Sequence, residues 1–269
     1  MSGVKNSIAV LLPHYNNCSG LRISLKSLQS EIQPFTLFVY DDGSNDFSYV
    51  ERIISEFREF YDIRLKRNSK NLGITETLNR GLKHILECNT YEFIARLDAG
   101  DICVGSRFEN QIRTFNIDKE LGLVGSWVKF VDINRNKLFF FKPPSGYKEL
   151  KRSMHSYNPF IHSSVMFRTD VVKAVGFYPT NYPALEDYAF FFKIIKKFKA
   201  TVVEKTLVEY EYNPEGISIK RRGEQTKSRI KLLMNEYKFG LFTTIGLVRA
   251  FITFVLPFKL LLFFKKKFI

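Results

Sequence analysis

The chain has 269 residues, 45% of them hydrophobic, and carries 41 Lys or Arg against 27 Asp or Glu, a net charge of +14. This length can bury a sizeable core and suits one α/β domain with an appendage, or two small domains. Its three cysteines, with no C-x-x-C spacing, argue against a disulfide framework and a zinc site and favour a reducing, cytoplasmic setting.

The excess positive charge lies at the C-terminal end of the chain. Residues 220–269 hold twelve Lys or Arg and two Glu, which leaves a net charge of about +4 on residues 1–219. This distribution does not indicate a nucleic-acid partner and suggests an anionic surface as the partner of the tail. We therefore expect a folded domain over residues 1–219 and a basic, hydrophobic helical tail over residues 220–269.

The first hundred residues alternate between buried strands and amphipathic helices. Apolar and β-branched runs predict strands within residues 7–17, 35–46, 61–68 and 91–97. Apolar residues at helical spacing predict helices within residues 19–30, 47–60 and 72–88. This alternation is typical of an α/β fold with a doubly wound, mostly parallel, Rossmann-like central sheet.

Polar side chains follow each of the four strands at its carboxyl end. They are His14 to Asn16, Asp41 and Asp42, Asn68 to Asn71, and Asp98 with Asp101. Doubly wound sheets bind their ligands beyond the carboxyl ends of the strands. The four clusters together therefore predict one shared binding site.

The second half of the chain is less regular. Residues 121–132 and 137–143 are expected to pair as strands in a small antiparallel extension, and residues 200–213 form another strand. Residues 184–198 predict a helix that opens with Glu186 and Asp187, where acidic side chains suit the helix dipole. The Phe runs at 139–141 and 190–192 are expected in the core rather than on a sugar-binding surface.

The motifs limit the chemistry to carboxylates. There is no glycine-rich phosphate loop and no G-x-S-x-G turn. Asp98 and Asp101 could hold Mg²⁺ or Mn²⁺, which would neutralise the charge of a leaving diphosphate. Asp41 could accept a hydrogen bond from a nucleobase, and a further carboxylate could act as general base toward a hydroxyl. The residues thus fit a nucleotide-diphosphate substrate, a divalent metal and a hydroxyl acceptor, without naming the transferred group.

Six motifs in this order and spacing resemble those of family 2 glycosyltransferases, over roughly residues 7–215. They read VLLPHYNN, FVYDDGSND, NLGITETLNRGL, FIARLDAGD, HSSVMFR and LEDYAFFFKI. The resemblance implies the GT-A fold and transfer of a sugar, with inversion, from a nucleotide-activated donor. It further implies bacterial lipopolysaccharide or capsule synthesis. The expected donor is a UDP-sugar, and the expected acceptor is a growing glycan, either free or lipid-linked.

The resemblance also assigns roles to individual residues. Asp41 matches the aspartate that contacts the base, Asp98 matches the first acidic residue of the family's D-x-D motif, and Asp187, beside Glu186, matches the catalytic base. His162 matches a histidine that contacts phosphate or acceptor, with a buried core histidine as the alternative. The full donor-binding set is Pro13, Tyr15, Asn16, Asp41, Asp42, Asn71, Arg96 and Asp98.

The sequence departs from the family pattern at Gly100, where the usual motif has a second metal-binding aspartate. Either Asp101 supplies the missing carboxylate, or it only caps a helix that starts near Val104. Arg96 pairs with a carboxylate or with the donor diphosphate, and an ordinary structural ion pair is the alternative.

The apolar run of the tail, residues 240–264, is long enough to cross a bilayer. Arg249, Lys259 and Pro257 interrupt it, which favours a helix lying in the membrane plane, with Lys265–Lys267 at an anionic leaflet. This predicts a cytoplasmic protein that is peripheral on the inner face of the cell membrane. The alternative is a tail that packs on the domain as an ordinary helix pair.

Two other functions compete with glycosyl transfer. A sugar-nucleotide nucleotidyltransferase has a similar fold, but PHYNNCSG lacks the glycine-rich, basic loop that such enzymes carry after the first strand. A non-catalytic basic protein that binds membrane or nucleic acid is supported only by the charge of the tail.

Overall fold

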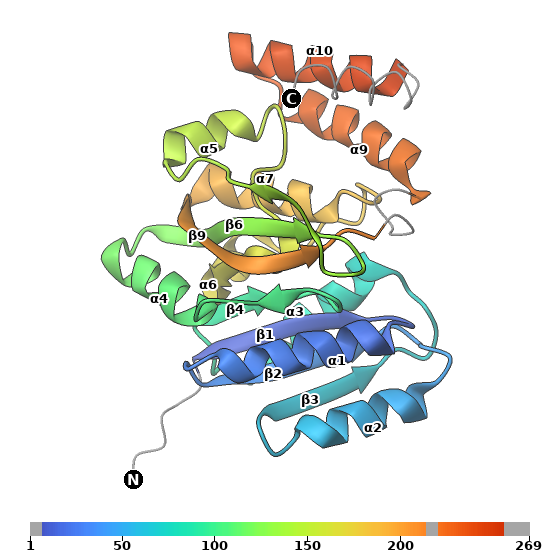
Figure 1. Cartoon of the computed structure of the whole chain (residues 1–269). Helices are drawn as coiled ribbons and strands as arrows, with labels where there is room; N and C mark the ends of the chain where they lie inside the picture. Colours follow the sequence, from blue (N-terminus) through green and yellow to red (C-terminus); the bar gives the residue numbers. More distant parts are fainter. Residues whose placement is uncertain (1–6, 214–219, 256–269) are drawn as a thin grey trace.

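The computed structural model describes residues 7–213 and 220–255, and within these residues nine strands form one sheet (Figure 1). The strands are β1 (Ile8–His14), β2 (Phe35–Asp41), β3 (Asp62–Arg67), β4 (Phe93–Arg96), β5 (Ile102–Cys103), β6 (Leu121–Val131), β7 (Lys137–Phe141), β8 (Met166–Arg168) and β9 (Lys199–Glu211).

The order of the strands is β3-β2-β1-β4-β8-β6-β9-β5, and β7 pairs with β6 outside this path. The strands β3, β2, β1 and β4 run parallel, and so do β6 and β9. Antiparallel pairing joins β8 to both β4 and β6, β5 to β9, and β7 to β6. The predicted mostly parallel sheet with a small antiparallel extension is confirmed.

Helices cover both faces of the sheet, as Figure 1 shows. Side chains of β1 alternate between two apolar layers: Val10 and Leu12 pack toward α1, α2 and α4, while Ala9 and Leu11 pack toward α3, α6 and α7. The helices are α1 (Cys18–Ser27), α2 (Phe47–Phe57), α3 (Ile74–Cys88), α4 (Arg107–Ile117), α5 (Tyr147–Ser153), α6 (Thr169–Val175), α7 (Glu186–Lys197), α9 (Arg222–Asn235) and α10 (Leu241–Val255).

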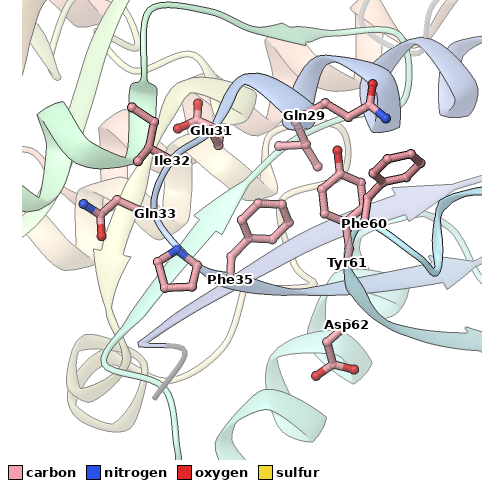
Figure 2. Close-up of a pocket in the computed structure, with 10 residues that line it drawn as sticks. Gln29, Glu31, Ile32, Gln33, Phe35, Phe60, Tyr61 and Asp62 are labelled. Carbon is pink, nitrogen blue, oxygen red and sulfur yellow. The ribbon is translucent and has the colours of Figure 1, made fainter. Parts of the chain in front are cut away.

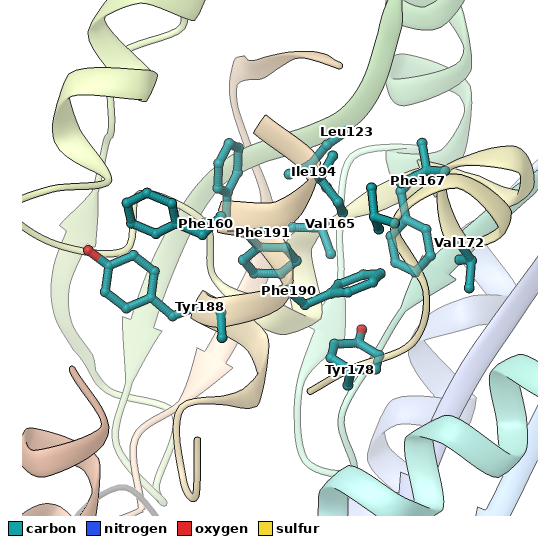
Figure 3. Close-up of a cluster of buried hydrophobic side chains, with 14 of the residues drawn as sticks. Leu123, Phe160, Val165, Phe167, Val172, Tyr178, Tyr188, Phe190, Phe191 and Ile194 are labelled. Carbon is teal, nitrogen blue, oxygen red and sulfur yellow. The ribbon is translucent and has the colours of Figure 1, made fainter. Parts of the chain in front are cut away.

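Aromatic side chains of α7 fill the second of these layers (Figure 3). Phe190 and Phe191 are fully buried, and the ring centroid of Phe190 lies 4.3 Å from that of Tyr178. The run at 190–192 is therefore core, as expected. The expectation was wrong for the other run: Phe139 is 50% and Phe140 45% exposed, because β7 pairs with β6 alone.

The C-terminal helices pack on α7 and on the loop that precedes it. On α9, Leu232 and Leu233 are buried, and Ser228 Oγ donates a hydrogen bond to the Pro183 carbonyl over 2.9 Å. On α10, Ala250 is fully buried, and a Cβ at Gly246 would meet the His155 carbonyl oxygen at 1.8 Å.

The opposite side of α10 exposes about half of each apolar side chain at Ile245, Val248 and Ile252. Within residues 7–213 and 220–255, no helix combines the length and the apolarity that crossing a membrane requires. The prediction of a helix in the membrane plane also rests on Pro257, Lys259 and Lys265–Lys267, and these residues lie outside the described ones.

Candidate functional site

The carboxyl ends of β1, β2 and β4 bring three of the predicted clusters together. His14 of β1 pairs with Asp41 of β2 in the parallel register, and Leu11 of β1 lies beside Arg96 of β4. The clusters come from separate motifs but meet at one edge of the sheet because parallel strands end on the same side.

The side chain of Asp41 is fully buried and is held by three hydrogen bonds. Its Oδ1 accepts from the backbone N–H groups of Gly43 and Ser44 at 3.1 and 2.9 Å. Its Oδ2 lies 2.9 Å from His14 Nδ1, and His14 Nε2 accepts from the backbone N–H of Asn17. Burial alone would raise the pKa of Asp41, but the bonds from His14 and Ser44 outweigh it and lower the pKa. Asp41 is therefore a fixed anion.

Asp42 joins the second cluster to the third. Its Oδ1 accepts from Asn68 Nδ2 at 2.9 Å and from the backbone N–H of Leu72 at 2.8 Å, and its Oδ2 accepts from the backbone N–H of Gly73. Asp42 thereby fixes the loop at the start of α3, and Asn71 lies exposed on this loop.

The loop after β1 leaves two of the predicted donor-binding residues accessible. Pro13 is buried within β1, whereas Tyr15 is 45% exposed. Asn16 is also exposed and has a positive φ of 48°, and its Oδ1 accepts from the backbone N–H of Asn45 at 2.9 Å. Asn16 ties this loop to the one that follows β2.

A chain of buried polar groups leads from Asp98 into the core. Arg96 is fully buried, and its Nη2 lies 2.5 Å from Asp98 Oδ1. Its Nε donates to His162 Nε2 at 3.1 Å, and that nitrogen lies 2.9 Å from the hydroxyl of Tyr178. Burial would raise the pKa of Asp98, but the charge of Arg96 outweighs it and lowers the pKa. Burial, and to a lesser extent the charge of Arg96, lowers the pKa of His162 to about 3. This histidine is therefore neutral.

The turn of the D-A-G-D motif is held by α1. Ser24 Oγ donates to the carbonyl oxygens of Asp98 and Asp101 and accepts from the backbone N–H of Gly100. Asn17 Nδ2 donates to the Ala99 carbonyl at 3.0 Å. Gly100 has a φ of 114°, and a Cβ there would lie 3.5 Å from Glu211 Oε1. A side-chain carboxylate from β9 thus lies beside the position where this motif lacks its aspartate.

Asp101 does not cap a helix, so that alternative was wrong. Residues Ile102–Cys103 form strand β5, and the first N–H groups of α4 donate instead to the Glu31 carboxylate. Asp101 Oδ1 accepts from the backbone N–H of Glu211 at 2.9 Å, and its buried Oδ2 has no hydrogen-bond partner among the described residues. Burial, and then the charge of Asp98, raises the pKa of Asp101 to about 8.

The hairpin between β6 and β7 reaches this turn. Arg135, at the tip, has a positive φ of 66° and donates from Nη2 to the Gly100 carbonyl at 2.8 Å. The same Nη2 lies 3.1 Å from Glu211 Oε2. Arg135 thus anchors the tip of the hairpin to the D-A-G-D turn, a contact that no local sequence signal indicates.

Glu186 and Asp187 form the first turn of α7, as the sequence predicts. Asn158 Nδ2 donates to Asp187 Oδ2 at 3.2 Å, and the backbone N–H of Tyr188 donates to Oδ1. Burial raises the pKa of Asp187 to about 7, and the charges of Glu186 and Asp98 add to this shift. Burial also raises the pKa of Glu186. Asp187 is therefore a carboxyl poised to exchange a proton near neutral pH.

The carboxylates of the D-A-G-D turn have the chemistry that a hard divalent cation requires. Asp98 is one-third exposed at its side chain, and Asp101 Oδ2 is a buried oxygen without a partner. No group of three or more His, Cys, Asp or Glu within the described ranges is arranged to hold a metal ion. Two carboxylates suffice for Mg²⁺ or Mn²⁺ when phosphate oxygens and water complete the shell.

One cavity lies away from this site. Its volume is ≈ 350 Å³, and Figure 2 shows Phe35, Phe60, Tyr61 and Asp62 among the residues that line it. Phe35 and Asp62 begin β2 and β3, so the cavity lies at the amino ends of the strands, opposite the carboxylates. Its position separates it from the chemistry described above.

Comparison with known proteins agrees with this geometry. Residues 9–176, more than half of the chain, match the family described as Glycosyl transferase family 2. The chain is 28% identical over 245 residues to the Escherichia coli UDP-Gal:alpha-D-GlcNAc-diphosphoundecaprenol beta-1,3-galactosyltransferase, covering 89% of this chain and 85% of that protein.

Two solved structures share the fold. TarS 1–349 of S. aureus in complex with UDP-GlcNAc superposes with a TM-score of 0.67 at 18% identity, over 92% of this chain and 73% of that one. A mannosyltransferase of Pyrobaculum calidifontis in complex with GDP-Man and Mn²⁺ gives a TM-score of 0.66 at 17% identity, over 92% and 69%. The expected GT-A fold is confirmed. With its family match and the carboxylates at the carboxyl edge of its sheet, the chain belongs to glycosyltransferase family 2.

Proposed function

We propose that this enzyme moves a sugar, with inversion, from a nucleotide-diphosphate donor to a hydroxyl of a growing cell-surface glycan. The observation that carries the proposal is the environment of Asp187. Its carboxyl is partly buried at the start of α7, has a pKa of about 7, and lies close enough to Asp98 for the charge of Asp98 to raise that pKa. A base poised near neutral pH therefore faces the carboxylate proposed to bind the donor.

The step needs one base and one leaving group. Asp187 takes the proton of the acceptor hydroxyl, and the oxygen attacks the anomeric carbon as the bond from that carbon to the diphosphate breaks. The electron pair of the broken bond leaves on the diphosphate, and attack from the opposite side inverts the anomeric centre. A divalent metal bound by Asp98 and Asp101 would supply neutralising charge to that diphosphate. Arg96 fixes the orientation of Asp98.

The donor is proposed to be a UDP-sugar, bound along β1, β2 and β4. The Escherichia coli relative uses UDP-Gal by its name, and the TarS complex contains UDP-GlcNAc. Tyr15 and Asn16 are exposed beside Asp41, which suits a base and ribose at this place. Asp41 is proposed to orient the backbone N–H groups and His14 around the nucleotide, because its own oxygens are already bonded.

The acceptor is proposed to be a lipid-linked glycan at the cytoplasmic face of the membrane. The Escherichia coli relative acts on a diphosphoundecaprenol-linked sugar by its name. On α10, Ile245, Val248 and Ile252 form an exposed apolar side on the most basic part of the chain. Such a helix suits a position in the plane of an anionic surface. Catalysis would then occur beside the lipid.

A panel of nucleotide-sugars tests the function. Purified protein with Mn²⁺ should hydrolyse one UDP-sugar slowly and should transfer the same sugar faster when a glycosyl-diphosphate lipid is added. Release of pyrophosphate from UTP and a sugar phosphate would instead show a nucleotidyltransferase. No turnover of any donor, by protein that remains folded, would contradict the proposal.

A further inference from the structure

We propose that the outer ring face of Phe139, at the end of an aromatic row with Phe130 and Tyr210, forms the binding platform for a pyranose ring of the acceptor. The row lies on one face of the sheet and crosses strands β7, β6 and β9. This inference rests on the proposed function, since it names the place of the acceptor in that reaction.

The register of the strands places the three rings side by side. Phe130 pairs with Phe139 across the antiparallel β6–β7 ladder and with Tyr210 across the parallel β6–β9 ladder. The ring centroids of Phe130 and Phe139 are 4.5 Å apart with 13° between the planes, and those of Phe130 and Tyr210 are 4.8 Å apart. At these separations the rings pack against one another, so the three side chains form one aromatic row whose exposed end is Phe139.

The inner end of the row lies at the carboxylates. Burial raises the pKa of Tyr210 most. The negative charges of Asp101, Asp98 and Asp187 raise it further, so the Tyr210 hydroxyl lies near these carboxylates. The backbone N–H of Glu211, the neighbour of Tyr210, donates to Asp101 Oδ1 at 2.9 Å. The row thus begins beside the groups that bind the donor and deprotonate the acceptor.

The outer end of the row is open to solvent. Phe139 is 50% exposed on a strand that pairs only with β6. An exposed aromatic face close to a catalytic centre suits an apolar ring face of a ligand. Phe141 joins this row to the catalytic side: its ring centroid lies 6.4 Å from that of Phe130 and 6.3 Å from that of Tyr157. The residue after Tyr157, Asn158, donates to Asp187.

The occupant follows from the geometry of the reaction. The acceptor must place one hydroxyl at Asp187, so the rest of its sugar must lie on a surface that adjoins this residue. The donor half of the site lies over β1, β2 and β4, whereas β6, β9 and β7 lie on the other side of β8. The aromatic row extends from the carboxylates across these strands to the exposed ring of Phe139, and a pyranose presents a matching face of C–H groups.

The hairpin that carries the row is fixed relative to the donor. Arg135 at its tip donates to the Gly100 carbonyl at 2.8 Å, within the D-A-G-D turn. A sugar ring stacked on Phe139 would therefore hold a constant distance from the metal-binding turn. This arrangement gives positioning of the acceptor without any residue of α10 or of the tail.

The test compares Phe139→Ala with a matched variant, Phe60→Ala. Phe60 is similarly exposed, at 53%, but lines the cavity at the opposite end of the strands (Figure 2). Binding of methyl pyranosides, in the presence of UDP and Mn²⁺, is measured by saturation-transfer NMR. Acceptor KM, kcat and donor hydrolysis are measured on the same proteins.

We expect Phe139→Ala to weaken pyranoside binding and to raise the acceptor KM about three- to tenfold, the usual scale for one aromatic contact. Donor hydrolysis should not change, Phe60→Ala should behave as the native protein, and Phe139→Tyr should restore binding. Thermal unfolding checks that Phe139→Ala stays folded, and Phe139→Leu, which keeps an apolar side chain on β7, should show the same loss.

Unchanged acceptor KM and pyranoside binding in Phe139→Ala and Phe139→Leu would overturn the platform, as would the absence of pyranoside binding to the native protein. A dimer in light scattering that Phe139→Ala dissociates would also overturn it, because the row would then cover a second copy of the chain. If the native protein does not hydrolyse any donor, the proposed function itself fails. If donor hydrolysis is normal but the Phe139 variants keep the native acceptor KM and pyranoside binding, only the platform is rejected.

Discussion

His14 holds the carboxylate of Asp41 in the interior of the donor half of the site. Nδ1 of His14 lies 2.9 Å from Oδ2 of Asp41, and both side chains are fully buried. The backbone N–H of Asn17 donates to Nε2 of His14, so the proton of the imidazole lies on Nδ1 and points at Asp41. One histidine therefore joins the end of β1, the end of β2 and the start of α1.

Replacing His14 should weaken donor binding and stability together. In His14→Ala, Asp41 loses a buried partner, which should cost about 1–3 kcal/mol of unfolding free energy and should raise the Kd for UDP. Denaturant unfolding and calorimetric titration with UDP measure the two effects. His84→Ala is the control, since His84, on α3, bonds the hydroxyl of Tyr40 and not the carboxylate of Asp41. A His14→Ala protein with native stability and native UDP affinity would show that this pair has no structural role.

Asp187→Asn should reduce transfer by at least ~100-fold, the usual scale for loss of a general base, and should leave donor binding nearly intact. The native kcat should rise with pH through about 7, because Asp187 must lose its proton to act as a base and its pKa is about 7. In Asp187→Asn, kcat should no longer rise with pH through about 7. A residual pH limb with near-native turnover would indicate Glu186 or another group as the base.

The same substitution should stabilise the protein at alkaline pH. The pKa of Asp187 is raised by folding, so the folded state keeps a proton that the unfolded chain releases above pH ~4. This contribution to stability is present at low pH and is lost as the pH rises through about 7. Asp187→Asn should therefore raise the Tm more at pH 8 than at pH 5. An equal effect at both pH values would show that the buried charge is not the cause.

Asp101→Asn should raise the Mn²⁺ concentration needed for binding. Asp101 Oδ2 is a buried oxygen without a hydrogen-bond partner among the described residues, which suits a metal ligand. We expect the Mn²⁺ Kd, measured by EPR in the presence of UDP, to rise about 10-fold or more. Asp170→Asn, on the exposed first turn of α6, is the control. Native Mn²⁺ affinity in Asp101→Asn would leave Asp98 and the diphosphate as the metal site.

The exposed side of α10 should bind anionic vesicles at low salt. Ile245→Ser with Ile252→Ser should reduce co-sedimentation with phosphatidylglycerol vesicles while hydrolysis of free donor persists, because these side chains lie on the helix far from the carboxylates. Ile117→Ser, at an 81% exposed position at the end of α4, is the matched control. A native protein that stays in the supernatant would contradict the membrane proposal.

The sequence predicts the donor half of the fold well because its signals are local. Apolar runs followed by Asp, Asn and Gly define the strands and place Asp41, Asp42 and Asp98 at one edge. The helix start at Glu186 and Asp187 is equally local. The alternation of strands and helices also predicts that these strands run parallel, but it does not give their order in the sheet.

The supporting contacts could not be predicted because they join residues far apart in the chain. Ser24 binds the D-A-G-D turn from 76 positions away, and Asp101 accepts from the Glu211 backbone across 110 positions. The exposure of Phe139 depends on β7 lacking a second neighbouring strand, which an apolar run does not reveal. The sequence places His14 in the polar cluster that ends the first strand, but it does not reveal that the His14 ring bonds the Asp41 carboxylate.

The stereochemistry of the product tests the central claim most directly. An α-linked UDP-sugar that the native enzyme accepts is incubated with an acceptor. Proton NMR of the product then measures the coupling between H1 and H2 of the transferred sugar, which reports its anomeric configuration. A single attack on the anomeric carbon, with Asp187 as base, predicts a β-linked product. An α-linked product, with the donor's configuration retained, would contradict the assignment of Asp187 and the inverting reaction.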